Sequence, residues 1–463
     1  MKKIFLVDRQ ANSMVLESIL KNTDWYVQIL IVLDEEHKKK YCNHERIGIV
    51  YTATEFFILE ETANVDFYKC KQYEALFKII DAGMYRIKAD YQFTRYNFYM
   101  GVTIWEKMFD KYSPDLCLLA GLVHGLTIDA LMLSVARKKN VPGYLISNIS
   151  TNLLLTYKNW GDDILMLKSE YRQNDIQNVV KKAAHYYYQL EPNKHKIYSV
   201  KRFISLIIYK IGGETLRQII LSILNRSAYF TWYKGRKVQT SIFNHVIKTL
   251  QWKYITSNND AKSIRANCNS KYVMYFLHFE PEAVITHYAS YMDSQIIIIK
   301  MIAQSLPKGW KLYVKEHPDS RKLNDDVFAY FAEFYEPYNS TWYWDSIRNT
   351  PNVEFIRVKE DATKLIKNAS AVATIAGTVI MESILENIPC LVFGDAKKIP
   401  YSSINGIYNI TSTDDCLRAL NEIDNSAWKG YENIEKTLSM CLLTCDENGY
   451  DSAVKNIIED VKK

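Results

Sequence analysis

The sequence predicts an α/β protein that contains two Rossmann-like domains. The chain opens with apolar residues 4–7, a helical stretch from Met14 and a second apolar run at residues 26–33, which is a β-α-β pattern. A strand, a glycine loop, a helix and another strand follow within residues 114–146. Between residues 311 and 395, three further apolar runs each end in glycine or polar residues. Because 463 residues exceed one ordinary core, two domains of this class are expected.

The composition is that of a globular protein, with 48% hydrophobic and 24% charged residues. The 34 tyrosines suit carbohydrate or interface surfaces, although a compositional bias of the source would also account for them. The eight cysteines form no C-x-x-C pair, which indicates free thiols in a reducing cytoplasm. The apolar run after Met1-Lys2-Lys3 is too short for a signal peptide, and no stretch approaches the roughly 20 apolar residues of a membrane span. We therefore predict a cytoplasmic protein.

In the first half of the chain, two loops follow predicted strands directly. The opening strand ends at Asp8, and the strand at residues 114–120 runs into a glycine loop that contains His124. Ligands of open α/β sheets bind at the carboxyl ends of strands, so both side chains are candidate cleft residues. For His124, packing or the start of the next helix is the alternative. The other elements predicted here are strands at residues 26–33, 48–51 and 141–146 and helices at residues 14–20, 70–112 and 127–139.

A basic segment separates the two halves. Residues 194–253 contain twelve Lys or Arg against one acid, Glu214, and apolar runs and aromatic residues are interleaved with these charges. This pattern predicts an amphipathic helical hairpin that contacts an anionic membrane surface through residues 195–253. An internal helical pair with solvated charges is the alternative. The net charge of +6 is small for this length, so we expect no nucleic-acid partner.

The second half repeats the strand and helix alternation. The predicted units are a first domain at residues 1–190, a basic helical segment at 191–260, a second domain at 261–425 and C-terminal helices at 426–463. The second domain is expected to hold strands at residues 272–277, 311–315, 353–358, 371–374 and 390–393 and helices at residues 292–305, 361–368 and 378–386.

A strand, glycine and helix element at residues 371–386 has the composition of a phosphate site. Gly377 lets the backbone approach a ligand closely, and the helix that follows offers free N–H groups. Thr378 adds a hydroxyl donor. Glu382, one turn into the helix, would reach a ribose diol while the phosphate lies at the helix start. A solvated helix residue is the alternative for Glu382. The element lacks both the G-K-[ST] of a P-loop and the G-x-G-x-x-G of the dinucleotide fingerprint.

Charged residues also close the strand at residues 311–315. Alternation places Lys315 and His317 on one side of this strand and Glu316 on the other. A lysine and a histidine on one side would neutralise a nucleotide phosphate. Pro318 stops the strand and shapes the loop that follows.

Residues 272–395 resemble the capsule polysaccharide biosynthesis family, whose members include glycosyltransferases for Kdo-containing bacterial surface glycans. The resemblance covers about a quarter of the chain, and its pieces recur in the family's order. The matching pieces are the strand before His278-Phe-Glu-Pro-Glu-Ala283, the Gln295 helix, Leu-Pro-Lys-Gly-Trp310, Val-Lys-Glu-His-Pro318, Gly377-Thr-x-x-x-Glu382 and Pro389-Cys-Leu-Val-Phe-Gly-Asp395.

The resemblance implies a GT-B-like fold, in which two Rossmann-like domains face a central cleft. It implies that the second domain binds a nucleotide sugar, with a CMP-linked donor favoured over a UDP-linked one, and that the first domain binds a glycan or glycolipid acceptor. By the same resemblance, His317 contacts the donor phosphate and Glu382 holds the ribose. Since no D-x-D pair lies in a suitable loop and no His/Cys cluster appears, a metal-independent reaction is expected, without a cofactor.

Glycosyl transfer needs a base for the acceptor hydroxyl, or a nucleophile if the configuration is retained. The candidates, in order of preference, are Glu280, His124 and Asp8. Glu282 is a further candidate, with a helix cap as its alternative role. Two other functions remain open: a teichoic-acid-type polyol-phosphate transferase and a non-catalytic GT-B-like subunit of a capsule assembly or export complex. The sequence does not distinguish the donor sugar, the linkage or the oligomeric state.

Overall fold

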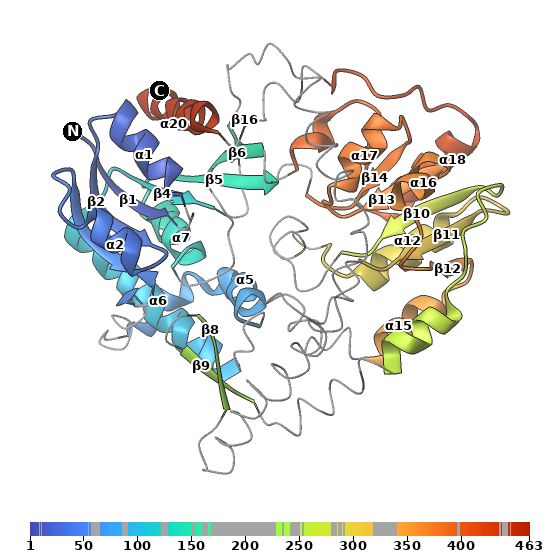
Figure 1. Cartoon of the computed structure of the whole chain (residues 1–463), viewed down its shortest axis with the longest axis horizontal. Coiled ribbons are helices and arrows are strands. Elements are labelled where there is room, and N and C mark those ends of the chain that lie inside the picture. The colour runs from blue at the N-terminus through green and yellow to red at the C-terminus, as the bar shows by residue number, and fades with distance from the viewer. Residues whose placement is uncertain are drawn as a thin grey trace, which may run out of the picture.

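The chain folds into two α/β domains, seen side by side in a computed structural model (Figure 1). The structure describes residues 1–8, 10, 12–53, 55–56, 65–85, 91–121, 128–150, 153–159, 165–167, 228–233, 236–240, 251, 254–278, 285, 289, 292–317, 340–395, 399–434, 437, 443–444 and 446–463. No helix within these ranges is long and apolar enough to cross a membrane.

The first domain is built on a mixed sheet in the order β16-β6-β5-β4-β1-β2-β3, with β7 paired to β6. Strands β1 to β5 run parallel to one another, and β6, β7 and β16 extend the sheet in antiparallel fashion. The order β3-β2-β1-β4-β5 is that of the first five strands of a Rossmann sheet. The strands are β1 (Lys3–Asp8), β2 (Tyr26–Val32), β3 (Ile47–Thr52), β4 (Leu116–Ala120), β5 (Gly143–Ser150), β6 (Leu153–Lys158), β7 (Leu165–Met166) and β16 (Leu443–Thr444).

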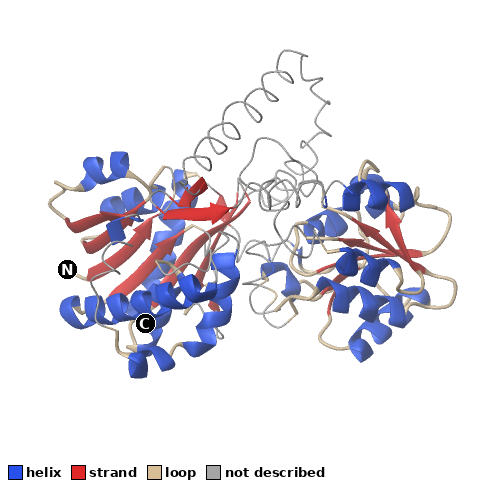
Figure 2. Cartoon of the chain, turned by 90° about the horizontal axis from the view of Figure 1, so that it is seen from below, coloured by secondary structure: helices blue, strands red, loops and turns tan. Residues whose placement is uncertain are grey.

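Helices cover both faces of this sheet (Figure 2). Ile4 and Leu6 of β1 pack toward α1, α2 and α20, whereas Phe5 and Val7 pack toward α4 to α7. This alternation follows from the twofold period of a strand. The helices are α1 (Met14–Asn22), α2 (Glu35–Tyr41), α4 (Phe67–Lys71), α5 (Glu74–Tyr85), α6 (Tyr91–Tyr112), α7 (Ala130–Lys138) and α20 (Glu447–Lys462).

The C-terminal helix α20 packs on the first domain, although it follows the second domain in sequence (Figure 1). Its Asp451 accepts hydrogen bonds from Ser18 Oγ at 2.6 Å and Asn22 Nδ2 at 2.8 Å, and lies 2.9 Å from Lys21 Nζ. Tyr144 OH donates to Asp460 Oδ2 at 2.7 Å at the other end of the helix. These polar contacts fix α20 against α1 and the sheet.

The second domain is built on a sheet in the order β12-β11-β10-β13-β14-β15, in which every pair of neighbours is parallel. Numbered within the domain, this is the order 3-2-1-4-5-6 of the Rossmann fold. The strands are β10 (Tyr272–Phe276), β11 (Lys311–Lys315), β12 (Val353–Ile356), β13 (Ala371–Thr374), β14 (Cys390–Val392) and β15 (Ile407–Asn409). The predicted α/β fold with two Rossmann-like domains, the GT-B-like arrangement, is confirmed.

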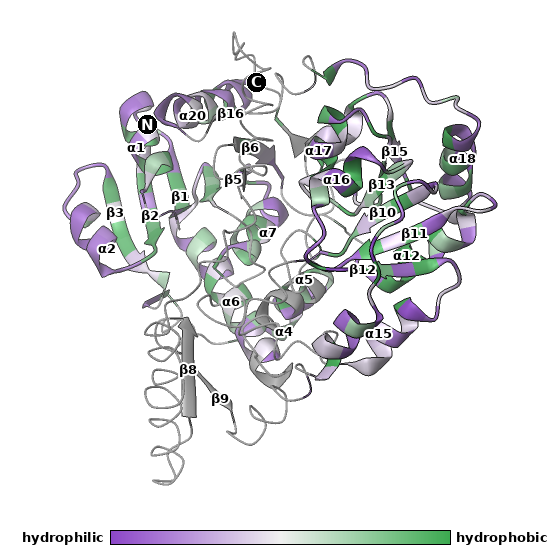
Figure 3. Ribbon diagram, turned by 45° about the vertical axis from the view of Figure 1, so that its right-hand side comes forward, coloured by the Kyte–Doolittle hydropathy of each residue, from purple (hydrophilic) through white to green (hydrophobic). Residues whose placement is uncertain are grey.

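Each face of the second sheet has its own helical layer. The core formed by Val273, Leu312 and Val314 packs against α12, α15 and α18, while Tyr272 and Tyr313 face α16. The strands of both sheets are largely hydrophobic in Figure 3, whereas α2, on the outside, is largely hydrophilic. The helices are α12 (Gln295–Ser305), α15 (Thr341–Arg348), α16 (Ala362–Lys367), α17 (Val379–Leu385), the 3₁₀ helix η4 (Pro400–Ser403) and α18 (Thr413–Asp424).

One prediction needs correction. The basic segment at residues 191–260 was expected to be helical, but β8 (Ala228–Tyr233) and β9 (Arg236–Thr240) form an antiparallel hairpin within it. The physical reason is the local preference of β-branched and aromatic residues for a strand, and four of them follow one another here: Tyr229, Phe230, Thr231 and Trp232. Residues 251 and 254–260 are helical, and the remainder of the segment lies outside the described residues.

Candidate functional site

Three strand ends of the second domain lie side by side. β10 is the central strand, with β11 on one side and β13 on the other. Phe276 at the end of β10 pairs with Lys315 at the end of β11, and Tyr275 pairs with Ala373 next to the end of β13. The predicted residues after β11 and after β13 are therefore separated by one strand, and the residues that follow β10 lie between them.

The side chains at these ends share one face of the sheet. Tyr313 and Val372 pack in the cluster with α16, so Lys315 and Thr374, two residues further along their strands, point to the same face. Strand β11 ends at Lys315, so Lys315 is the one residue of the predicted alternating set Lys315, Glu316 and His317 that lies within the strand, and the sides taken by the other two stay a prediction. The predicted lysine thus lies on the face that α16 covers.

A buried histidine connects β10 to the glycine loop after β13. His278 is 7% exposed, and its Nε2 lies 3.0 Å from Thr374 Oγ1 and accepts a hydrogen bond from Ile375 N at 3.3 Å. Its backbone N donates to Gln295 Oε1 on α12 at 2.8 Å. Thr374 Oγ1 in turn accepts from Gly377 N at 3.2 Å. His278 therefore holds the start of the glycine loop from the neighbouring strand.

These contacts indicate the tautomer of His278. An amide N–H can only donate, so Nε2 acts as the acceptor toward Ile375, and the proton of a neutral ring is then on Nδ1. Because Thr374 Oγ1 accepts from Gly377 N, its own hydrogen is available for Nε2. Each donor in this series of hydrogen bonds therefore meets an acceptor, and together the bonds hold the glycine loop after β13 in place.

Gly377 occupies a position with no room for a side chain. A Cβ built on it would lie 2.8 Å from Thr374 Oγ1 and 3.1 Å from His278 Cε1. Both distances are shorter than ordinary van der Waals contacts, so glycine is needed for the close approach of this loop to the strand ends. The sequence suggests that a glycine here lets the backbone approach a ligand. The structure adds a second reason, because a side chain at this position would collide with Thr374 and His278.

Lys315 is a buried cation. Lys315 is 4% exposed, and this burial lowers the pKa of its ammonium group. The negative charges of Glu316, Asp361 and Glu360 raise the pKa, but their effect is smaller. Asp361 is committed to capping α16, where it accepts from Thr363 N and Lys364 N. Among the described residues, the Lys315 ammonium has no hydrogen bond or ion pair with a side chain. Because an unpaired buried charge is costly, this arrangement indicates a place for an anion.

The remaining predicted residues of this half differ in exposure. His317 is half-buried just past β11, whereas Thr378 is exposed at the N-cap of α17 and its side chain makes no cap hydrogen bond. Glu382, half-buried on α17, has its pKa raised to about 7, chiefly by burial and secondarily by the charge of Glu386. A carboxyl group that titrates near neutrality accepts hydrogen bonds from hydroxyl groups once it is ionised.

In the first domain, Asp8 lies at the carboxyl end of β1 and is 1% exposed. Burial raises its pKa to about 6, and Gln10 N donates to its Oδ1 at 3.1 Å. Its Oδ2 has no hydrogen-bond partner in the described part of the chain, and neither has Gln10 Oε1 or Ser147 Oγ close by. Gln10 Nε2 donates to Asn148 Oδ1 at 3.2 Å, which ties the loop to β5. The carboxyl ends of β1 and β5 therefore carry buried polar atoms that are available to bind a ligand.

The Asp8→Asn variant is expected to be more stable than the wild type, with an effect that grows with pH. Since the folded-state pKa of Asp8 is raised, the free energy of unfolding falls as pH rises from about 4 to 6. The variant has no carboxyl group to ionise, so its free energy of unfolding should exceed that of the wild type by about 3 kcal/mol at pH 8 and by about half of that at pH 5. Urea unfolding at both pH values measures the difference, and an equal gain at the two values contradicts it.

Several predicted residues cannot be placed. His124, Glu280, Glu282 and Pro318 lie outside the described residues. Their roles remain predictions. Within the described ranges, no group of three or more His, Cys, Asp or Glu side chains is arranged to hold a metal ion.

The residue that the sequence-based selection missed is His278. In the sequence it is only the residue after a strand, and the two acidic residues that follow it, Glu280 and Glu282, have the more obvious catalytic chemistry. The available signal was its position, because it follows a buried strand as closely as His317 does. Only the pairing of β10 between β11 and β13 shows that His278 lies at the centre of the three ends.

Comparisons with known proteins give distant structural matches. No family model and no curated protein matches this sequence. UDP-GlcNAc 2-epimerase from Methanocaldococcus jannaschii, in complex with UDP-GlcNAc and UDP, aligns at 11% identity and TM-score 0.31, over 99% of this chain and 100% of that chain.

Two further solved structures are similarly distant. UDP-GlcNAc 2-epimerase from Neisseria meningitidis aligns at 10% identity and TM-score 0.29, over 99% of both chains. KpsC, a β-Kdo 2,7 transferase from Thermosulfurimonas dismutans, aligns at 8% identity and TM-score 0.31, over 90% of both chains. The fold assignment rests on the strand order of the two sheets.

Proposed function

We propose that this protein is a glycosyltransferase that takes a sugar from a nucleotide donor bound in the second domain. The observation that carries the proposal is the buried ammonium of Lys315, which lies at the carboxyl end of a Rossmann-like sheet without an anionic side-chain contact among the described residues. Phosphate groups of ligands bind at this edge of such sheets. A donor phosphate would supply the missing counter-charge.

The other donor contacts follow from the same edge. By the alternation predicted from the sequence, His317 would share the face of Lys315 and contact a donor phosphate, as the family resemblance implies. The backbone at Gly377 offers close approach, and Thr378 offers an exposed hydroxyl. The ionised Glu382 carboxylate would accept hydrogen bonds from the ribose diol. We favour a CMP-activated acidic sugar such as Kdo as donor, in the synthesis of a bacterial capsule or surface polysaccharide.

The acceptor is assigned to the first domain in this proposal. The arrow of β5 in Figure 1 points toward the second domain, and Asp8 lies at the same end of the parallel strands. Its Oδ2 has no hydrogen-bond partner among the described residues, and burial raises the pKa of the Asp8 carboxyl group to about 6, which suits a general base near neutral pH. The base would take the proton of the acceptor hydroxyl as that oxygen attacks the anomeric carbon, while Lys315 and His317 stabilise the departing nucleotide phosphate.

The proposal extends to the setting of the reaction. Peripheral contact with an anionic inner membrane through residues 195–253 would bring the active site to a glycolipid acceptor. A metal-independent reaction is part of the proposal, since Lys315 and His317 would supply the positive charge at the leaving group.

Thermal stabilisation by nucleotides tests the donor assignment. Wild type and His317→Ala are to be heated with CMP, CDP, UDP and GDP, and a nucleotide at 100 times its dissociation constant adds about 2.7 kcal/mol to the free energy of unfolding. We expect stabilisation by CMP that His317→Ala reduces. Stabilisation by UDP alone would change the donor class, and the absence of any shift would favour a non-catalytic subunit.

The products of donor breakdown separate the two transferase classes. Incubation with a CMP-linked sugar should release the free sugar in the absence of acceptor if the protein is a glycosyltransferase. A polyol-phosphate transferase would instead act on a CDP-linked polyol and release the polyol phosphate.

A further inference from the structure

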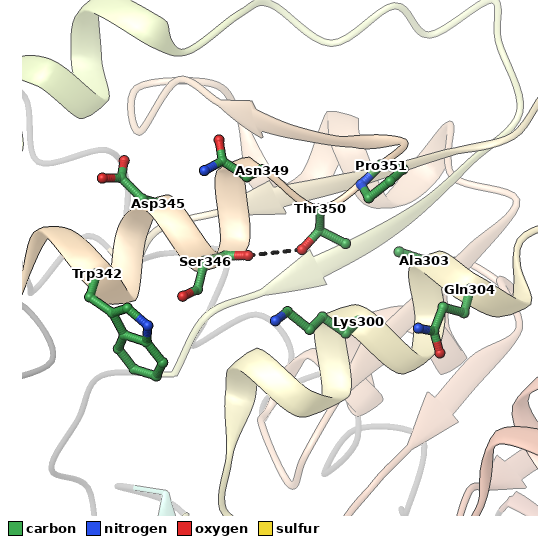
Figure 4. A pocket seen from close by; sticks show the side chains of 9 residues that line it. All are labelled: Lys300, Ala303, Gln304, Trp342, Asp345, Ser346, Asn349, Thr350 and Pro351. Carbon is green, nitrogen blue, oxygen red and sulfur yellow. Dashed lines mark hydrogen bonds between the residues drawn. The ribbon is translucent and has the colours of Figure 1, made fainter.

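A pocket of 580 Å³ lies in the second domain between α12 and α15 (Figure 4). Its volume is within the range of small-ligand sites. α12 contributes Lys300, Ala303 and Gln304, and α15 with the loop after it contributes the rest of the lining. Both helices pack on the face of the sheet that carries Val273 and Leu312. Lys315 points to the opposite face, so this pocket is separate from the proposed donor site.

An exposed tryptophan stands at one end of the pocket. Trp342 is 69% exposed, although its neighbours Tyr343 and Trp344 on α15 are buried in the core. Figure 4 shows its indole ring extending into the space between α15 and α12. Because the ring borders the pocket and is exposed, its apolar face is available to a ligand. A flat indole face matches the apolar C–H face of a pyranose ring, whose hydroxyl groups point outward from its rim.

Polar side chains surround the space beside the ring. Gln304 and Asn349 offer amide donors and acceptors, and Ser346 offers a hydroxyl. Thr350 is held in place because its Oγ1 donates to the Ser346 carbonyl at 2.9 Å. An apolar ring next to several neutral donors and acceptors is the composition of a carbohydrate site, because each sugar unit presents one apolar face and several hydroxyl groups.

The charges of the pocket favour an acidic sugar. Asp345 forms an ion pair with Arg348 one turn further along α15, so its negative charge is compensated. Lys300 has no ion pair among the described residues, and in Figure 4 its ammonium points from α12 toward Ser346. The pocket therefore presents one uncompensated positive charge, which complements a carboxylate.

We propose that the pocket between α12 and α15 binds an acidic oligosaccharide, with one pyranose ring stacked on Trp342 and its carboxylate at Lys300. This inference extends the proposed function, because a growing glycan held here would stay near the active site and raise its effective concentration. Binding itself requires no donor and no transfer, so it can be measured independently of the reaction.

Isothermal titration calorimetry with tetragalacturonic acid, α2,8-linked tetrasialic acid and neutral maltotetraose tests the site. We expect at least one acidic tetrasaccharide to bind the wild type more tightly than maltotetraose does. Trp342→Ala and Lys300→Gln should each weaken that binding by roughly tenfold or more, as expected for loss of a stacked ring or a charge-assisted hydrogen bond.

Matched surface variants serve as controls. Tyr68→Ala removes an aromatic ring that is 87% exposed on α4, and Lys455→Gln removes an exposed charge on α20. Both should bind as the wild type does, and Lys315→Met should also retain glycan binding even if it loses nucleotide binding. The inference is overturned if no acidic tetrasaccharide binds, if maltotetraose binds equally well, or if Trp342→Ala leaves the affinity unchanged.

Discussion

Replacing Lys315 with methionine is expected to weaken nucleotide binding strongly while leaving the protein folded. Methionine keeps the apolar stem of the buried side chain and removes only the charge. Loss of a charge-assisted hydrogen bond to phosphate costs about 3 kcal/mol, which corresponds to roughly 100-fold weaker binding. Calorimetric titration with the nucleotide that stabilises the wild type measures this change directly.

The stability of the same variant distinguishes a ligand-binding role from a structural one. Burial lowers the pKa of Lys315, so the folded state disfavours its charged form at pH 7. Removing the charge should therefore leave the free energy of unfolding unchanged or increase it. If Lys315→Met instead destabilises the protein and binds nucleotide normally, the lysine has a structural role and the donor assignment fails.

Lys311 provides the matched control for this experiment. It lies on the same strand as Lys315 and on the same face, but its side chain is 40% exposed and its Nζ lies 3.3 Å from Glu354 Oε1. Lys311→Met should change nucleotide affinity little, because Lys311 lies at the amino end of β11, away from the strand ends. A comparable loss in both variants would indicate a general effect of charge.

Replacing Gly377 with alanine is expected to have the second largest effect on donor binding. The added methyl group would lie 2.8 Å from Thr374 Oγ1 and 3.1 Å from His278 Cε1, and both groups are held by the hydrogen bonds that join β10 to the loop. The loop must shift away from the strand ends, at a cost of about 1–3 kcal/mol. We expect nucleotide affinity to fall by roughly tenfold to 100-fold.

A second glycine shows whether any added methyl group has this consequence. At Gly143, the nearest atom to a built Cβ is the end of the flexible Leu133 side chain at 3.3 Å, which can move aside. Gly143→Ala should bind nucleotide as the wild type does. Normal nucleotide affinity in Gly377→Ala, measured by the same titration, would show that the loop does not approach the donor.

The sequence was sufficient to predict strands β1 to β5 and β10 to β14, whereas β6, β7, β15 and β16 of the two sheets were not predicted. Apolar runs such as residues 272–277 and 311–315 must be buried, and an abrupt change to Lys315, His317 or Gly377 marks the edge of a parallel sheet. Local chemistry also accounts for Asp361 as the cap of α16, since its carboxylate accepts from two amides of the first turn. These features depend on neighbours in the chain.

Local sequence patterns predicted secondary structure less reliably where the same residues are compatible with both a helix and a strand. The hairpin of β8 and β9 lies in a segment whose charges and apolar residues also suit an amphipathic helix. Aromatic residues are compatible with both structures, and only pairing with a partner strand decides between them. The helical prediction was therefore wrong for residues 228–233 and 236–240.

The sequence by itself determined the fold class, the strand ends and the residue types available there. The tertiary structure decided which of those residues meet: β10 lies between β11 and β13 and brings His278 to Thr374, and α20 returns to α1 over more than 400 residues of sequence, as the contact of Ser18 with Asp451 shows. It also decided that Lys315 is buried and that Trp342 is exposed. Strand order, burial and charge compensation arise from contacts between segments that are distant in sequence, so they cannot be predicted from the spacing of residues along the chain.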